Sequence, residues 1–185
     1  MAPRDLSVSR AELFALVLRA CRGAGLPQSH GEDFAVAVSR FGDRAAIEAL
    51  ARALVAGWRM PSLREEGGRL WVSDARATCD LPVACDALFA GVSEVRLEAL
   101  DEPGLIAPFL ARETQERALF LRASGGPGLW VLKRRQPERE LSPPGGRITV
   151  ARETFNALQS HAAKTYVPAT QTSRQGAGAG AIDND

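Results

Sequence analysis

Residues 118–133 read ALFLRASGGPGLWVLK, and this stretch decides the fold class of the second half of the chain. The glycines and the proline at 125–128 suit a tight turn, because glycine reaches positive φ and proline fixes φ. The segments Ala118–Ala123 and Leu129–Lys133 on either side carry the apolar and aromatic residues typical of strands. The pattern predicts a β-hairpin. These glycines are therefore interpreted as a turn and not as a phosphate loop.

Further strands and short helices are expected around the hairpin. Val92–Leu100 alternates between apolar and polar residues, and shorter strands are predicted at Arg69–Ser73 and Arg147–Val150. Pro82–Ala90 and Pro103–Ala111 each suit a short helix, although Pro108 falls inside the second. The sequence therefore predicts a mostly antiparallel sheet with flanking short helices.

Helical spacing dominates both ends of the folded part. Ser9 and Glu12 have the spacing of a capping box at the start of a first helix, and two more helices follow before residue 60, the third capped by Asp43. A C-terminal helix is expected at Arg152–Lys164. The fold class predicted is α+β: an N-terminal three-helix subdomain, the sheet, and the C-terminal helix. A single domain at 1–164, divided into 1–60 and 61–164, precedes a Gly-rich tail at 165–185.

Composition and charge exclude several classes of protein. Lys and Arg number 23 against 22 Asp and Glu, a net charge of +1, which creates no long-range field for nucleic acid or an anionic membrane. The basic residues at 133–139 are interrupted by acidic ones and are interpreted as a solvated hairpin exit. No stretch is long and apolar enough for a membrane span, and residues 1–5 lack a signal-peptide core. We expect a cytoplasmic protein that binds neither nucleic acid nor membrane.

The tail at 165–185 reads TYVPATQTSRQGAGAGAIDND and supplies the candidate binding residues. Its composition alone indicates a flexible segment. Its glycines nevertheless permit close backbone approach to a ligand, Arg174 can hold a carboxylate or phosphate, and its carboxylates suit either solvent or a hard cation. A metal site is not predicted. The alternating glycines lack the flanking strand and helix of a dinucleotide fingerprint. The predicted ligand-binding residues are Tyr166, Ser173, Arg174, Gly176, Gly178, Gly180, Asp183 and Asp185.

Two blocks of sequence resemble a bacterial family known only as a domain of unknown function. The tail combines TYVPAT, Ser173-Arg174, GAGAG and a closing Asp-Asn-Asp, which resembles the end of that family, and the run CRGAGL at 21–26 resembles its start. The resemblance implies a functional tail and implies no activity, substrate or cofactor. Separately, the first two helices, about a quarter of the chain, resemble the N-terminal region of malate and lactate dehydrogenases of the non-Rossmann type. The histidine-glycine features expected further along that family are missing.

Residues able to perform acid–base or nucleophilic chemistry are few. His30 follows a turn and suits a partly exposed polar position, while His161, just before the tail, is the better candidate base. Cys21, Cys79 and Cys85 have no metal-ligand spacing and suit reduced core positions. No catalytic residue, cofactor or oligomeric state is assigned.

Two hypotheses of different kinds remain open. In the first, the chain is a small-molecule binder or enzyme-like protein whose tail forms part of a polar site as a lid or strap. In the second, it is a noncatalytic accessory subunit that docks the tail into a partner protein as an extended peptide. The scarcity of acid–base residues favours the second hypothesis, and the mixed polar groups of the tail favour the first.

Overall fold

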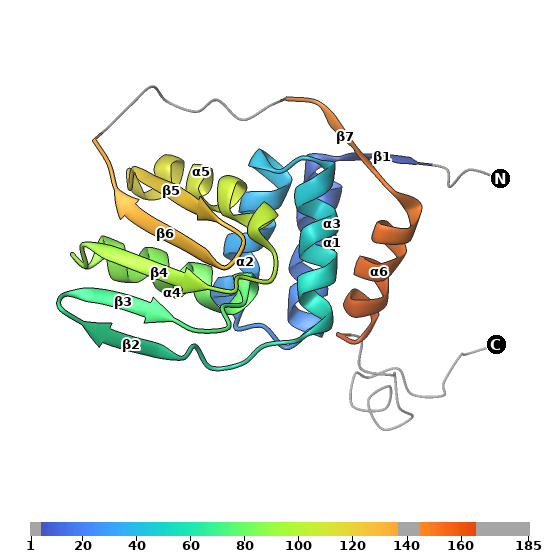
Figure 1. The fold of residues 1–185 in the computed structure, drawn as a ribbon. Coiled ribbons are helices and arrows are strands. Elements are labelled where there is room, and N and C mark those ends of the chain that lie inside the picture. Colours follow the sequence, from blue (N-terminus) through green and yellow to red (C-terminus); the bar gives the residue numbers. More distant parts are fainter. Residues whose placement is uncertain (1–4, 137–144, 166–185) are drawn as a thin grey trace, which may run out of the picture.

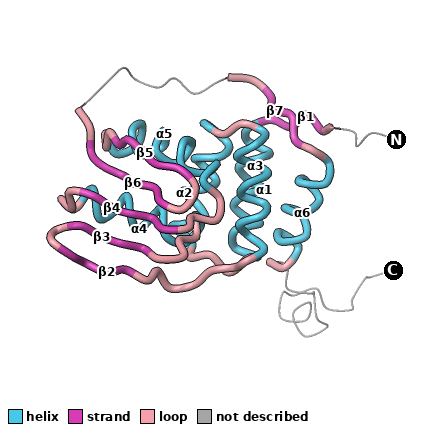
Figure 2. Tube along the Cα trace, viewed as in Figure 1, coloured by secondary structure: helices cyan, strands magenta, loops and turns pink. Residues whose placement is uncertain are grey.

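The computed structural model describes residues 5–136 and 145–165 of the chain. A five-stranded sheet has α4 and α5 against one of its faces, and α1, α2 and α3 stand beside one end of it (Figures 1 and 2). Helix α6 packs on the far side of α1. In chain order the elements are β1 (Leu6–Ser9), α1 (Arg10–Gly23), α2 (Gln28–Val36), the π-helical turn η1 (Ala37–Phe41), α3 (Arg44–Val55), β2 (Leu63–Glu66), β3 (Arg69–Val72), α4 (Ala77–Phe89), β4 (Glu94–Glu98), the 3₁₀ turn η2 (Pro103–Leu105), α5 (Ile106–Arg117), β5 (Leu121–Gly126), β6 (Leu129–Arg134), β7 (Arg147–Val150) and α6 (Arg152–Ala163).

The α+β fold class predicted from the sequence is confirmed. The large sheet has the order β2-β3-β4-β6-β5, and three of its four pairings are antiparallel. Strands β3 and β4 run parallel because α4 connects them, as a parallel pair requires a crossover. The predicted hairpin is β5–β6, in which Ala123 pairs with Leu132 and the turn contains Gly128 at a φ of 98°.

The helix starts predicted in the first sixty residues are also confirmed. The Ser9 hydroxyl accepts a hydrogen bond from the Glu12 amide at 3.2 Å, and Glu12 accepts one in return from the Ser9 amide at 2.7 Å. The carboxylate of Asp43 accepts a hydrogen bond from the Ala46 amide at 2.9 Å at the start of α3. Local side-chain capping therefore places the starts of α1 and α3.

The boundaries of the two middle helices differ from the prediction. Helix α4 begins at Ala77, five residues before the proline at which we expected it to start, so Pro82 lies inside the helix. Pro82 has no N–H for the carbonyl of Thr78, and His30 hydrogen-bonds to the Thr78 backbone. Helix α5 extends to Arg117, and Pro108 lies in its first turn, where the missing N–H removes no helical hydrogen bond.

Two strands escaped the sequence prediction. Strand β2 is exposed at every position, so it carries no alternation of apolar and polar residues. Strand β1 is four residues long and pairs with β7, for example Leu6 with Val150. The predicted strand at 147–150 therefore exists but belongs to a separate two-stranded sheet.

One cluster of buried apolar side chains extends from α1 through the sheet to α6. The sheet contributes the buried side chains of Val95 and Leu132 to this core. The rings of Phe34 in α2 and Phe109 in α5 pack together, with their centroids 4.9 Å apart. The other face of the sheet carries Trp71, which lies between the guanidinium groups of Arg64 and Arg96 at 5.7 and 4.3 Å from the ring centroid. The sheet thus has one apolar face and one polar face, as is common in antiparallel sheets.

Candidate functional site

All eight residues predicted to bind a ligand lie at 166–185, outside the described residues. Their role stays a prediction. The structure does describe the segment from which they continue: α6 ends at Ala163, and the amide of Thr165 donates to the Ala162 carbonyl at 3.1 Å. The site is therefore built from the residues around α6.

The run at 21–26, one of the two sequence blocks that carry the family resemblance, lies against the end of α6. An ideal Cβ at Gly23 would lie 1.8 Å from the carbonyl oxygen of His161, so α1 and α6 meet there backbone to backbone. Gly25 follows at a φ of 84°, in the left-handed region that favours glycine. The run at 21–26 thus lies beside the residues that immediately precede the tail, although it is 135 residues or more away in sequence.

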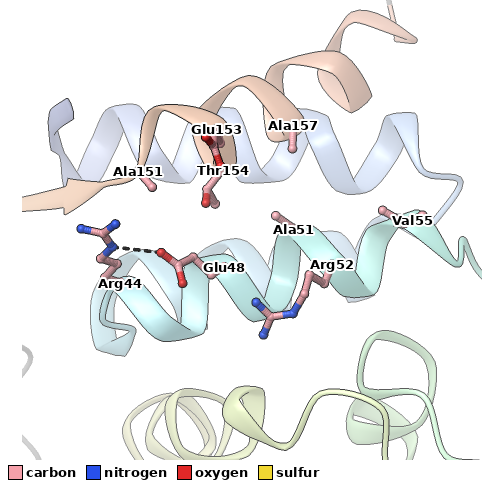
Figure 3. Close-up of a pocket in the computed structure, with 9 residues that line it drawn as sticks. All are labelled: Arg44, Glu48, Ala51, Arg52, Val55, Ala151, Glu153, Thr154 and Ala157. Atoms are coloured by element: carbon pink, nitrogen blue, oxygen red, sulfur yellow. Dashed lines mark hydrogen bonds and ion pairs between the residues drawn. The ribbon is translucent and has the colours of Figure 1, made fainter. Parts of the chain in front are cut away.

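A groove of about 450 Å³ lies between α3 and α6, and Figure 3 shows the side chains that line it. Small side chains line part of it, with Ala51 of α3 facing Ala157 of α6, and polar side chains line the rest. Small-molecule sites commonly have this volume. The lining residues are Arg44, Glu48, Ala51, Arg52, Val55, Ala151, Glu153, Thr154 and Ala157.

The cations of the groove are held by neighbouring carboxylates. The guanidinium of Arg44 donates to Glu48 at 2.9 Å and to Asp5 at 2.8 Å, and these partners raise its pKa. Arg52 binds Glu102 through two hydrogen bonds of 2.7 and 2.8 Å, which raise the pKa of Arg52 in the same way. Such paired arginines lose little conformational freedom when they bind a further anion.

The first turn of α6 contributes groups that remain available to a ligand. Ala151 is the N-cap residue and offers no side-chain hydrogen bond to the helix. Within the described chain, the side chains of Glu153 and Thr154 have neither a hydrogen bond nor an ion pair. Both residues line the groove, and Thr154 points from α6 toward α3 (Figure 3). The groove therefore presents guanidinium, hydroxyl and carboxylate groups together, which suits a polar molecule that carries both signs of charge.

A second polar cluster, which the sequence did not indicate, lies between α2 and α5. Arg112 contacts the carboxylates of Asp33 and Glu113, and its guanidinium is also 3.2 Å from Glu116. Burial raises the pKa of Asp33 to about 6 and raises that of Glu113, against the opposing charge of Arg112. Asp33 and Arg112 are 79 residues apart, so no local pattern marks the pair.

The histidines and cysteines offer little reactivity. Burial lowers the pKa of His30, and burial together with Lys164 lowers that of His161, so both are neutral at pH 7. All three cysteines are buried and unpaired, as predicted. Burial raises the pKa of the Cys21 thiol to about 12 and that of Cys85 well above its usual range, which suppresses the reactive thiolate.

The described residues form neither a metal site nor a membrane-spanning helix. At 5–136 and 145–165, no three His, Cys, Asp or Glu side chains come together as a metal site. None of the helices in these ranges is long and apolar enough to cross a membrane.

Comparisons with known proteins assign the chain to no family. No family model matches it, and neither does any curated protein sequence. Among solved structures, a malate dehydrogenase from Entamoeba histolytica is similar with a TM-score of 0.49 and 11% identity. The region of similarity covers 80% of this chain and 50% of the dehydrogenase chain. This likeness is too low to bear on fold or activity, so both resemblances drawn from the sequence stay predictions.

Proposed function

We propose that this protein binds a small polar molecule in the groove between α3 and α6, and that the tail at 166–185 completes the site. The observation that carries the proposal is the mixed lining of the groove. Arg44 and Arg52 are held in place by carboxylates, while Glu153 and Thr154 have no side-chain partner within the described chain. A carboxylate or phosphate on the ligand can pair with the two arginines, and a hydrogen-bond donor on the same ligand can bind Glu153 and Thr154.

The position of α6 connects the groove to the tail. The helix lines the groove with its first turns and leads directly into the tail at its other end. Its 12 residues span about 18 Å at a rise of 1.5 Å per residue. The tail reaches roughly 3.3 Å per residue when extended, so only about six of its residues are needed to return along α6. Arg174 and the glycines at 176–180 then come within reach of the groove.

The groove is proposed to bind a ligand, and its lining assigns no reaction. Within the described chain, neither a histidine nor a cysteine lines the groove, and Glu153 is its unpaired carboxylate. In this proposal the tail adds the carboxylates of Asp183 and Asp185. No reaction is assigned.

The test compares the full-length chain with a chain that ends after Pro168. Amide hydrogen exchange reports whether the tail covers the groove: we expect faster exchange at 151–157 in the truncated protein, and slow exchange at Gly176–Gly180 in the full-length protein. Melting temperatures in about 10 mM of each of a panel of amino acids, dicarboxylates and sugar phosphates then report binding, because a ligand raises the melting temperature of the form that binds it. Unchanged exchange at α6, together with no ligand-induced shift in the full-length protein, contradicts the proposal.

A specific surface feature favours the alternative of an accessory subunit. Val55, Trp58, Met60 and Leu63 are large apolar residues with 77, 36, 72 and 43% of their surface exposed, and they follow one another between α3 and β2. Exposed apolar residues gathered on one segment are typical of a protein contact. In this alternative the tail docks into a partner. The truncated chain then melts like the full-length protein but no longer retains a partner from a native extract.

A further inference from the structure

A second cavity, of about 490 Å³, lies at the end of the sheet opposite α3 and α6. It is bounded by the last residues of α4 and α5, the start of β5 and the end of β6 (Figure 1). Its lining combines arginines with apolar and aromatic side chains. The seven lining residues, all within the described chain and none of them acidic, are Phe89, Arg117, Ala118, Leu119, Phe120, Arg134 and Arg135.

Two of the arginines already have partners in the structure. Arg117 pairs with Asp86 at 2.6 Å and with Glu113 at 3.2 Å. Arg134 comes from β6 and donates a hydrogen bond to the carbonyl oxygen of Phe89 at the end of α4. The carboxylates partly offset the charge of Arg117, and the guanidinium of Arg134 lies at the negative end of the α4 dipole. The same contacts hold both guanidinium groups in one place. An anion that enters the cavity therefore meets arginines that are already ordered.

The aromatic part of the lining remains open to solvent. Phe89 is 52% exposed, and the guanidinium of Arg117 lies 4.3 Å from its ring centroid. Phe120 is half-buried beside it, and its carbonyl accepts a hydrogen bond from the Arg135 amide at 2.9 Å, which continues the β5–β6 pairing. A flat apolar group placed in the cavity can cover the exposed ring of Phe89 and gain the free energy of burying it.

Ala118 adds an observation of a different kind. It ends α5 in the left-handed region, at φ 49° and ψ 29°, where glycine is the usual residue. A side chain is disfavoured in this conformation because its Cβ lies close to the following carbonyl oxygen. Ala118 is one of the residues that line the cavity, so a residue other than glycine occupies a left-handed position in the cavity wall.

From these observations we infer that the cavity is a second binding site, for an organic carboxylate that carries a flat apolar or aromatic part. The carboxylate binds at the guanidinium of Arg134, and the flat part packs between Phe89 and Phe120. The inference does not depend on the tail or on the groove between α3 and α6.

Benzoate is the probe, and two molecules that each lack half of its chemistry are the controls. By nuclear magnetic resonance titration of the full-length protein we expect benzoate to shift the amide signals at 117–121 and 133–135, with a Kd on the order of 1 mM. Benzyl alcohol, which has the ring without the charge, and inorganic phosphate, which has charge without the ring, bind at least about fivefold more weakly. Shifts confined to other residues, no shift at about 20 mM benzoate, or equal binding of all three molecules overturn the inference.

Variants identify the groups that bind the probe. Arg134→Gln is expected to weaken benzoate binding about fivefold or more, and Arg134→Lys less, because it keeps the charge but loses the fork. Arg122→Gln is the matched control, since Arg122 is an exposed arginine on β5 that does not line the cavity. Ala118→Gly preserves the favoured backbone conformation and removes one wall, so it folds and binds benzoate about twofold more weakly. Wild-type affinity in both Arg134→Gln and Ala118→Gly contradicts the proposed site.

Discussion

The α1–α6 contact and the α2–α5 contact join the N-terminal helices to later parts of the chain by opposite means. At the end of α1, Gly23 brings two backbones together, and the atoms that a Cβ would meet there are uncharged backbone atoms of His161 and Ala162. Between α2 and α5, Arg112 bridges Asp33 and Glu113 beside the Phe34–Phe109 ring pair. The first contact depends on the absence of a side chain, and the second depends on the balance of three charges. We therefore expect different substitutions, and different changes of pH, to weaken the two contacts.

Removing the central cation should have the largest effect. In Arg112→Met, the carboxylate of Asp33 loses the guanidinium that it contacts, and Glu113 keeps only Arg117, although just 1% of the Glu113 side chain is exposed. We expect a loss of about 3 kcal/mol in the free energy of unfolding at pH 7.5, measured by urea denaturation. Arg40→Met is the matched control, because Arg40 is half exposed and lies 3.7 Å from Glu116. An Arg112→Met protein as stable as this control rules out a structural role for the cluster.

Adding a single methyl group at the other contact should have the next largest effect. In Gly23→Ala, the new Cβ meets the carbonyl oxygen of His161, which is backbone and cannot rotate away. The helices must separate, at a cost of about 2 kcal/mol that is the same at pH 5 and pH 8. Gly104→Ala is the control, since its Cβ meets only the Ala49 methyl at an ordinary 3.5 Å. Thermal melts of the two variants that agree within error would show that α1 and α6 adapt to a side chain.

The charged contact should respond to pH, and the uncharged one should not. Burial raises the pKa of Asp33 from 3.8 to about 6, so its protonated form is favoured by folding. Its contribution to stability is fully present below about pH 4 and is lost as the pH rises through 6. The groups that face Asp33 are Arg112, Glu113, Asp86 and Arg117.

The variant Asp33→Asn isolates this contribution. The stability of the wild type relative to the variant should fall by about 1 kcal/mol between pH 4 and pH 7, after allowance for the partial exposure of Asp33. Urea denaturation at four pH values measures it. A difference that stays constant, or that rises with pH, means that the ion pair with Arg112 outweighs burial.

A carboxylate on the polar face of the sheet should show the opposite sign and the smallest effect. Hydrogen bonds from Lys133 and Arg96 lower the pKa of Glu94 to about 2. Its contribution is present above about pH 4.5 and is lost as the pH falls through 2. Glu94→Gln should therefore cost about 0.5 kcal/mol at pH 7 and less at pH 3, measured against Glu98→Gln on the same strand. A larger cost at pH 3 than at pH 7 would reverse the assignment.

The parts of the molecule that the sequence predicted correctly are those in which neighbouring residues bond to each other. The capping box of Ser9 and Glu12 and the cap at Asp43 each act within three residues, and the turn at 125–128 depends on glycine and proline themselves. Burial of Cys21 followed from its apolar helical face, and a core position for Cys79 and Cys85 followed from the absence of metal-ligand or catalytic spacing. The site was less accessible to prediction, because its eight candidate residues lie outside the described chain, and the groove between α3 and α6 has no local signature.

By itself the sequence determined the α+β class, the hairpin, and the caps that begin α1 and α3, since these rest on backbone preferences and on hydrogen bonds between near neighbours. Only the tertiary structure decided that β7 pairs with β1, that β3 and β4 run parallel, that Gly23 meets His161, and that Arg112 meets Asp33. Strand β2 was missed because an exposed strand has no apolar alternation. The start of α4 was misplaced because the Ala77 amide donates to Asp101, a residue 24 positions away in sequence. Long-range partners of this kind are chosen by the packing of whole elements, and no short window of sequence contains that information.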